Sequence, residues 1–224
     1  MKKISETIEY IETRETPLSA EVVFVHGDGR LFVFDAGCGE EVVSETLDMI
    51  KAAACPVSVI LSHFHTDHVD NVAKIPFDRL YVSGYTAKQL SKKGYISEDD
   101  TRIVIAPEKD PLLIGKTAGD EEVVVRALPS SHSKGGLMLE AGRFAFLGDG
   151  AYPMYKNDER VYNNTRLREE IDALKQVKAD TCYLSHEFEK PKTRIWIVNR
   201  MQIIYSHRDK DSAFVPEGKD KIIL

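Results

Sequence analysis

The chain of 224 residues is poor in cysteine and tryptophan and has no long apolar run, and each shortage excludes a class of protein. Its three cysteines, Cys38, Cys55 and Cys182, are odd in number and form no CxxC pair, which argues against a disulfide-stapled scaffold. We expect each to be a small buried or half-buried thiol. No apolar run has membrane-spanning length, and the first lysines are followed by an acidic segment rather than the apolar core of a signal peptide. We therefore expect a cytoplasmic protein without a membrane partner.

An excess of positive charge is also missing. The formal net charge is −6, so general attraction to nucleic acid is not expected. The most basic stretch contains Lys190, Lys192, Arg194 and Arg200, which we interpret as a solvated helix face. With 42% hydrophobic and 29% charged residues, the composition is that of a globular protein, and the length suits one domain over residues 1–224. The oligomeric state is left open by these numbers.

Apolar patterns along the chain predict strands that alternate with helices. Residues 22–37 contain two apolar runs around a Gly-Asp-Gly turn, which is typical of a β-hairpin. Residues 42–54 have helical spacing at Val43, Leu47, Ile50 and Ala54. Further strands are expected at 56–62, 79–83, 101–106, 121–128, 137–141, 143–149 and 181–186, and further helices at 85–93, 164–177 and 190–205. On these patterns alone, the fold class is mixed α/β.

A dense group of possible metal ligands follows the strand expected at 57–61. The hexapeptide at 63–68, His-Phe-His-Thr-Asp-His, contains His63, His65, Asp67 and His68. Residues two apart in extended chain point the same way, so the first two imidazoles can converge on one ion. Asp67 and His68 are adjacent where the chain turns, so they can address a second ion. Imidazole nitrogen and carboxylate oxygen are ligands that zinc and related divalent ions prefer.

Three more candidate ligands each follow an expected strand. His132 comes after the strand at 121–128, Asp149 follows the strand residues 143–148, and His186 follows the strand residues 181–184. Sites in α/β proteins are commonly built where strands pass into loops. Each residue alone is weak evidence, but their common position supports one site.

With these residues in view, the chain resembles the hydrolases of the metallo-β-lactamase superfamily. The resemblance covers nearly the full length and has five ordered parts, which begin with Asp35 before Ala36-Gly37, continue with the hexapeptide, and end with the three ligand candidates above. It implies the metallo-β-lactamase fold, an αββα sandwich of two mixed β-sheets flanked by helices.

The resemblance also assigns a role to each matching residue. His63, His65 and His132 would hold one divalent ion, and Asp67, His68 and His186 a second. Asp149 would bridge the two, and Asp35 would orient the ligands. The two ions would be zinc, with iron or manganese as alternatives, and would share a bridging hydroxide as nucleophile. Asp67 would be the catalytic residue that accepts a proton from it.

The substrate class is open at this stage. We expect a hydrolase that cleaves a small ester, thioester, lactone or phosphoester. Asp149 stands where the commonest β-lactamases carry cysteine, so β-lactam cleavage is not expected. Tyr152, Tyr155 and Lys134 lie close to the ligands in sequence and are candidate substrate contacts, although loop packing explains the tyrosines equally well. The alternatives are a di-iron redox protein and a metal-binding protein without catalysis.

Overall fold

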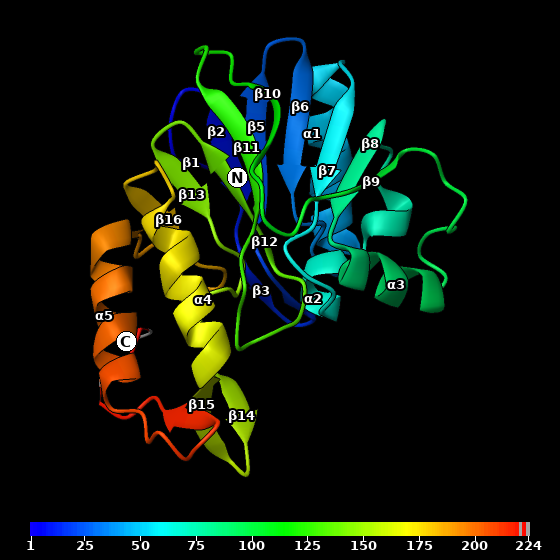
Figure 1. The fold of residues 1–224 in the computed structure, drawn as a ribbon. Coiled ribbons are helices and arrows are strands. Elements are labelled where there is room, and N and C mark those ends of the chain that lie inside the picture. Colours follow the sequence, from blue (N-terminus) through cyan, green and yellow to red (C-terminus); the bar gives the residue numbers. More distant parts are fainter. Residues whose placement is uncertain (220, 223–224) are drawn as a thin grey trace.

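The computed structural model describes residues 1–219 and 221–222 and shows two mixed β-sheets packed face to face (Figure 1). In the described part of the chain, the first sheet has seven strands in the order β1 (Lys2–Lys3), β2 (Ile8–Ile11), β5 (Val22–Gly27), β6 (Arg30–Phe34), β7 (Val57–Ile60), β8 (Arg79–Val82) and β9 (Ile103–Ile105). The second has six, in the order β10 (Leu112–Lys116), β11 (Glu122–Ala127), β12 (Leu137–Ala141), β13 (Phe144–Phe146), β16 (Thr181–Tyr183) and β17 (Lys192–Thr193).

Helices cover the outer face of each sheet. On the first sheet lie α1 (Glu40–Ala53), the short α2 (Thr66–Val69), a 3-10 turn at Val72–Lys74 and α3 (Gly84–Lys92). On the second lie α4 (Asn164–Lys175) and α5 (Arg194–Ser206), which pack against each other. The predicted αββα sandwich is therefore confirmed.

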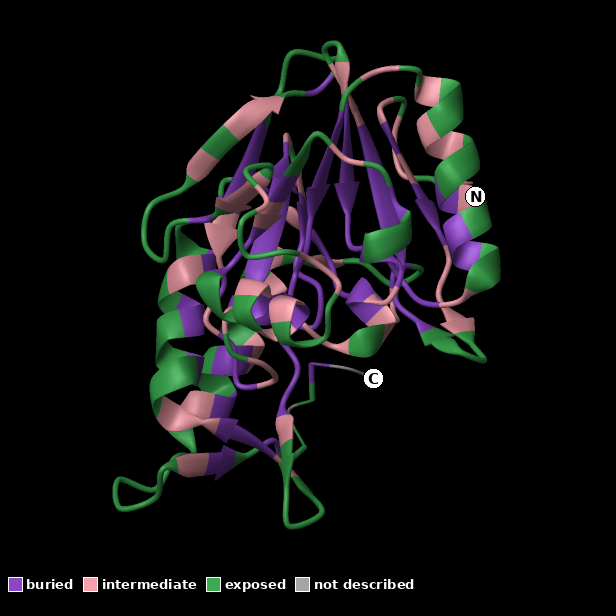
Figure 2. Cartoon of the chain, turned by 90° about the vertical axis from the view of Figure 1, so that its right-hand side faces the viewer, coloured by how far each residue is buried: buried purple, intermediate pink, exposed green. Residues whose placement is uncertain are grey.

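The hairpin of β5 and β6 shows why both sheet faces are buried. Its strands are largely apolar, and successive side chains point to opposite faces. Phe24 packs under the helices of the first sheet, whereas Val23 and Val25 face the second sheet together with Phe32 and Phe34. A third core lies between the second sheet and α4 and α5. Figure 2 shows the result, with buried strands inside and exposed helix faces outside.

Two small sheets complete the fold. Strands β3 (Arg14–Glu15) and β4 (Leu18–Ser19) form a short pair near the amino terminus, and β4 contacts α2. Strands β14 (Met154–Lys156), β15 (Glu159–Asn163) and β18 (Phe214–Pro216) form a three-stranded sheet at the amino-terminal end of α4 (Figure 1). The backbone N–H of Asn163 donates to Ser131 Oγ, which ties this sheet to the loop that follows β11.

The main elements expected from the sequence are present, with corrections to three details. Leu47, expected on the inner face of its helix, is 38% exposed, and Val42 and Thr46 are buried in its place. The last helix begins at Arg194 rather than at residue 190, because Thr193 caps its first turn by accepting from the N–H of Trp196. Lys190 therefore lies in a turn and Lys192 in β17, so the basic stretch is only partly helical.

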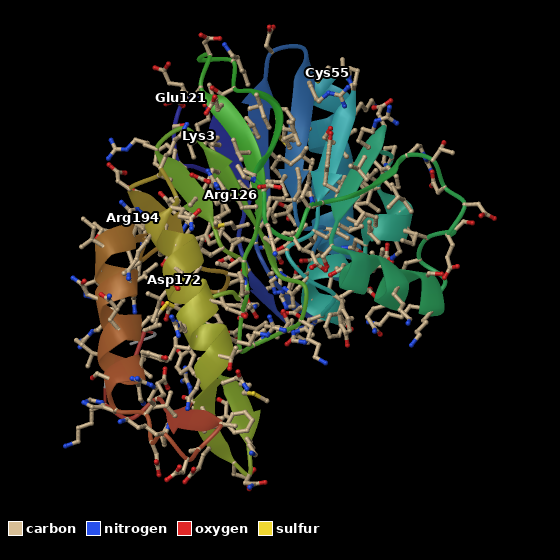
Figure 3. All side chains as sticks on the ribbon, in the orientation of Figure 1. Lys3, Cys55, Glu121, Arg126, Asp172 and Arg194 are labelled. Atoms are coloured by element: carbon tan, nitrogen blue, oxygen red, sulfur yellow. The ribbon has the colours of Figure 1, made fainter. Side chains whose placement is uncertain are left out.

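The cysteines agree with the expectation of small thiols without disulfides. Cys38 and Cys182 are buried, Cys55 is half-buried, and all three are free. Burial raises the pKa of Cys182 to about 12 and also raises the pKa of Cys38, which favours the protonated thiol in both. Cys55 follows α1 at the end of the sheets opposite α2 (Figure 3). In the described part of the chain, no helix is both long and apolar enough to cross a membrane.

Candidate metal centre

The candidate ligands gather at the end of the two sheets that lies next to α2 (Figure 1). The hexapeptide follows β7 in the first sheet, and its last residues form α2. The other candidates, His132, Asp149 and His186, follow β11, β13 and β16 in the second sheet. The site is therefore built from loops of both sheets, and it lies where these sheets meet.

One group of donors contains His63, His65, His132 and Asp149, whose donor atoms all lie within 4.8 Å of one another. His132 Nε2 is 3.1 Å from His65 Nδ1 and 3.1 Å from Asp149 Oδ2. The rings of His63 and His65 are 4.4 Å apart, as expected for residues two apart in extended chain. His63 and Asp149 are buried, and the other two are half-buried, so the group opens to solvent on one side.

A second group contains Asp67, His68, His186 and again Asp149, with the same 4.8 Å limit between donor atoms. His186 Nε2 is 3.2 Å from Asp67 Oδ2, and His68 Nε2 is 3.3 Å from Asp149 Oδ1. The two oxygens of Asp149 thus face different groups, Oδ2 the first and Oδ1 the second. This is the placement that a bridging carboxylate requires.

Asp35 and Ser62 form hydrogen bonds with the Nδ1 atoms of two cluster histidines, His63 and His68. Asp35 is fully buried and accepts from Ser62 N (2.7 Å), from Ser62 Oγ (2.8 Å) and from His68 Nδ1 (2.7 Å). Because the Ser62 hydroxyl donates to Asp35, its oxygen accepts from His63 Nδ1 at 3.0 Å. Both rings therefore carry their proton on Nδ1 and present Nε2 to the centre.

The charges of the group favour a cation at its centre. Burial raises the pKa of Asp149, but the charge on His68 and the close contacts of the carboxylate with His132 Nε2 (3.1 Å) and His68 Nε2 (3.3 Å) outweigh it and hold the pKa well below the usual range. Burial raises the pKa of Asp67 as well, but the close contact with His186 Nε2 (3.2 Å) outweighs it and lowers the pKa. Burial lowers the pKa of His63 well below its usual value, so this imidazole is neutral at pH 7. Ionised carboxylates and neutral imidazole are the protonation states that a metal requires.

His68 and His186 have raised pKa values for a related reason. Burial lowers both values, but the charges of Asp35 and Asp149 outweigh it at His68, and the hydrogen bond to Asp67 outweighs it at His186. A carboxylate thus stabilises positive charge at Nε2 of each ring. The same negative environment stabilises a metal cation at that position.

The donor set fits divalent metal ions. Among the described residues, three buried atoms that point into the cluster have no hydrogen-bond partner, namely His63 Nε2, His68 Nε2 and Asp149 Oδ1. Buried polar atoms are rarely left without a partner. Because these three belong to residues whose donor atoms meet in the cluster, metal binding at the cluster would account for them together.

The three residues expected to touch substrate lie in different surroundings. Tyr152 is buried, its hydroxyl donates to the Ser185 carbonyl, and its ring is 6.3 Å from that of His132. Tyr155 is 72% exposed on β14. Lys134 is exposed and lines a cavity of about 510 Å³, with its Nζ 5.9 Å from the ring centre of Tyr85. Their contact with substrate stays a prediction.

Sequence reasoning missed four polar residues that support the ligands. Ser62 precedes the hexapeptide, and Ser130 Oγ accepts from His132 N while it donates to the Gly150 carbonyl. Thr13 Oγ1 lies 3.3 Å from His186 Nδ1, and Glu21 accepts from His186 N at 2.7 Å. Only Ser62 had a signal, its position next to a ligand. Thr13 and Glu21 lie more than 160 residues from their partner, so no spacing in the sequence connects them.

The layers and the cluster define an αββα protein with a site suited to divalent metal. Comparison with known proteins gives the family. The model of the metallo-beta-lactamase superfamily matches residues 16–186, so the chain belongs to this superfamily. Family membership and the cluster together support a metal-dependent hydrolase in general. No curated protein matches the sequence.

Solved structures with the same fold are distant in sequence. A metallo-beta-lactamase from Pontibacter korlensis is 17% identical with a TM-score of 0.65, and the match covers 92% of this chain and 98% of that one. A metallo-beta-lactamase from Hirschia baltica is 13% identical with a TM-score of 0.62, covering 91% and 95%. A metallo-beta-lactamase family protein from Thermus thermophilus is 15% identical with a TM-score of 0.60, covering 92% and 80%. At these identities the likeness shows the fold alone.

Proposed function

We propose that the protein is a hydrolase with two divalent metal ions that cleaves a small ester, thioester, lactone or phosphoester. The observation that carries the proposal is the convergence of the buried, unpartnered atoms His63 Nε2, His68 Nε2 and Asp149 Oδ1 on one centre. The two donor groups share only Asp149, and each has four donors. This arrangement supports two ions rather than one.

Two bound ions would supply a hydroxide nucleophile near neutral pH and would polarise the oxygen of the scissile group. His63, His65 and His132 would hold one ion, Asp67, His68 and His186 the other, with Asp149 between them. Asp67 is 18% exposed in its side chain, so one of its oxygens can reach the solvent side of the site. There it would accept a proton from the attacking water while it contributes to the second ligand group.

Zinc is the ion that this donor set suits best. Each group has two or three imidazoles, and no cysteine lies in either group. Imidazole-rich sites with carboxylates are common for zinc, and they also accept iron and manganese. A di-iron redox protein would share the ligands but not the hydrolysis, and metal analysis of protein purified without oxygen distinguishes the two.

We assign to the substrate a cavity of about 510 Å³ that lies beside the donor cluster, although none of the seven candidate ligands lines it. One wall is the loop that carries His132, and another is Tyr85, whose ring is 5.4 Å from that of Phe64, next to the ligand His65. Lys134 lines this cavity and would meet an anionic part of the substrate. Tyr152 and Tyr155 would contact the substrate from the segment after Asp149, Tyr152 beside the ring of His132 and Tyr155 from the exposed strand β14.

The proposal includes a small-molecule substrate without nucleic acid or membrane partners. The net charge of −6 argues against binding to a polyanion. The three free cysteines support a reducing compartment, for which we propose the cytoplasm.

A substrate panel with and without chelator tests the proposal. Zinc-reconstituted protein is assayed on nitrophenyl esters, a thioester, a lactone and a nitrophenyl phosphodiester. We expect turnover of at least one class that chelator abolishes. Asp67→Asn should lower kcat at least about a hundredfold with zinc content retained, because the proton acceptor is lost. Asp172→Asn, on the outer face of α4 (Figure 3), is the control and should match the wild type.

Two results would contradict the proposal. Zinc-loaded protein inactive on every class would favour a metal-binding protein without catalysis. Full activity of Asp67→Asn would remove Asp67 from the mechanism while leaving the metal site intact.

A further inference from the structure

We propose that Thr13 is a positioning residue that fixes the tautomer of His186, so that Nε2 of this ring is free to hold the second ion. The inference rests on the proposed metal centre. It concerns the segment before β4, which contributes none of the seven candidate ligands.

The hydroxyl of Thr13 has one proton, and its position is determined by its neighbours. Thr13 Oγ1 lies 2.6 Å from the carbonyl oxygen of Ser19, which can only accept, so the hydroxyl proton is donated there. The same oxygen lies 3.3 Å from His186 Nδ1. With its proton engaged, Oγ1 can only accept from this nitrogen. Nδ1 of His186 therefore carries a proton.

The consequence appears on the other side of the ring. A neutral imidazole has one N–H, so a proton on Nδ1 leaves a lone pair on Nε2. That atom is 3.2 Å from Asp67 Oδ2 and 3.8 Å from Asp149 Oδ1, the carboxylates of the second donor group. The opposite tautomer would turn an N–H toward the ion and prevent coordination.

The backbone of His186 is held from the same side of the molecule. Its φ angle is +69°, a left-handed conformation that side chains with a Cβ rarely adopt. Glu21, buried at 3% exposure, accepts from His186 N at 2.7 Å and keeps the residue in this conformation. Thr13 and Glu21 both line a cavity of about 320 Å³ next to His186. Glu21 thus fixes the backbone position of His186, and Thr13 fixes which ring nitrogen faces the second donor group.

Two other histidines of the cluster, His63 and His68, support this interpretation. His68 donates from Nδ1 to Asp35, and His63 donates from Nδ1 to Ser62. In each case a buried oxygen acceptor holds Nδ1 and the opposite nitrogen points to the centre. Thr13 gives His186 the equivalent partner from a distant part of the chain.

The experiment compares Thr13→Val, which keeps the shape but removes the acceptor, with Thr13→Ser, which keeps the hydroxyl. Thr7→Val is the matched control, since Thr7 lies on the same segment and its hydroxyl contacts only Ser5 in the described part of the chain. Zinc binding to metal-free protein is followed by calorimetry. For Thr13→Val we expect the affinity of one of two zinc ions to fall ten- to hundredfold. In Thr13→Val the affinity for the other zinc ion should stay within about threefold of the wild-type value. In Thr13→Ser and Thr7→Val both zinc affinities should stay within the same limit.

A second measurement reads the tautomer without any metal. Nitrogen NMR of His186 in metal-free wild-type protein, recorded at rising pH until the ring holds a single proton, should show this proton on Nδ1. Thr13→Val should lose this preference, and Thr13→Ser should keep it. A wild-type proton on Nε2, or unchanged zinc affinity in Thr13→Val, would overturn the inference. If the wild type bound no zinc, the proposed function would be wrong. The NMR result would then still decide whether Thr13 fixes the tautomer of His186.

Discussion

At the scale of single residues, proton positions decide what each histidine can do. Asp35 accepts three hydrogen bonds, and through Ser62 and His68 it determines which nitrogen of two rings faces the centre. Its own φ angle of +62° is left-handed, so the residue after β6 is bent out of the strand direction toward Ser62 and His68. Such a conformation persists only where the surroundings hold it, and it is common at functional sites. Because two rings are oriented with Nε2 toward the centre, the histidine cluster can bind a cation.

Glu170 is a buried acid in α4 that the site does not use. It is fully buried, neither carboxyl oxygen has a hydrogen-bond partner among the described residues, and burial raises its pKa well above the usual range. The folded protein therefore holds this proton after the unfolded chain has lost it, above about pH 4.3. The resulting stability is complete below that pH and is lost as the pH rises toward the folded pKa.

We predict that Glu170→Gln, which stays neutral, gains stability over the wild type as the pH rises. The difference in unfolding free energy should grow by up to about 1.4 kcal/mol per pH unit above about pH 4.3, until the carboxyl group of the folded protein ionises. Urea unfolding at several pH values measures it. Glu169→Gln is the control, because Glu169 is exposed and its difference from the wild type should stay flat. A pH-independent difference for Glu170→Gln would mean that the carboxyl is ionised in the folded protein.

How much of the site the sequence predicts depends on how local the signal is. His63, His65, Asp67 and His68 could be found because one hexapeptide contains them and follows an apolar strand. His132, Asp149 and His186 needed the ordered resemblance, since a single polar residue after a strand is common. Thr13 and Glu21 could not be found, because the contacts that give them a role exist only after the amino-terminal segment has folded beside the last ligand loop.

At the scale of elements, strong apolar patterns were predicted and weak ones were missed. Strands β5, β6, β7 and β11 are rich in apolar and β-branched residues, so their sequences identify them. Strand β2 contains Glu9 and Tyr10, and β10 contains a glycine where the register shifts, so neither shows a clear pattern. Helix starts shifted because capping contacts, such as that of Thr193, decide them.

The loop after β13 places Asp149 through close packing of Gly148 on Ser62. Gly148 has a φ angle of +56°, and a Cβ at this position would lie 2.6 Å from Ser62 Cβ. Ser62 cannot give way, because its backbone and hydroxyl are both bonded to Asp35. The loop that carries Asp149 and the residue that orients His63 therefore require glycine here.

We predict that Gly148→Ala lowers the unfolding free energy by about 2–4 kcal/mol, from left-handed strain and overpacking together. Zinc affinity should fall as well, since Asp149 would move from both donor groups. Gly29→Ala is the matched control. Its φ angle is +68° but no atom lies within 4 Å of the added Cβ, so only strain of about 1 kcal/mol is expected. Chemical unfolding and calorimetry measure both effects, and equal losses in the two variants would show that the Ser62 contact is unimportant.

At the scale of the whole molecule, the donor groups join the two sheets. His63, His65, Asp67 and His68 follow β7 of the first sheet, whereas His132, Asp149 and His186 follow strands of the second. Each group takes donors from both sheets, so each bound ion would link them. An unfolded chain does not hold these donors together, so metal binding would stabilise the folded state.

We predict that zinc raises the melting temperature of the metal-free protein. At free zinc about one hundred times the dissociation constant, binding contributes about 2.7 kcal/mol per site, which for a protein of this size corresponds to roughly 5–11 °C. Thermal unfolding with zinc, and again after chelator, measures the shift. His132→Ala removes a donor of the second sheet from one group only, so it should lose part of the shift and keep the rest. Loss of the whole shift in this variant would indicate that the two groups bind as one inseparable unit, and no shift in the wild type would show that the ligand loops do not join the sheets through metal.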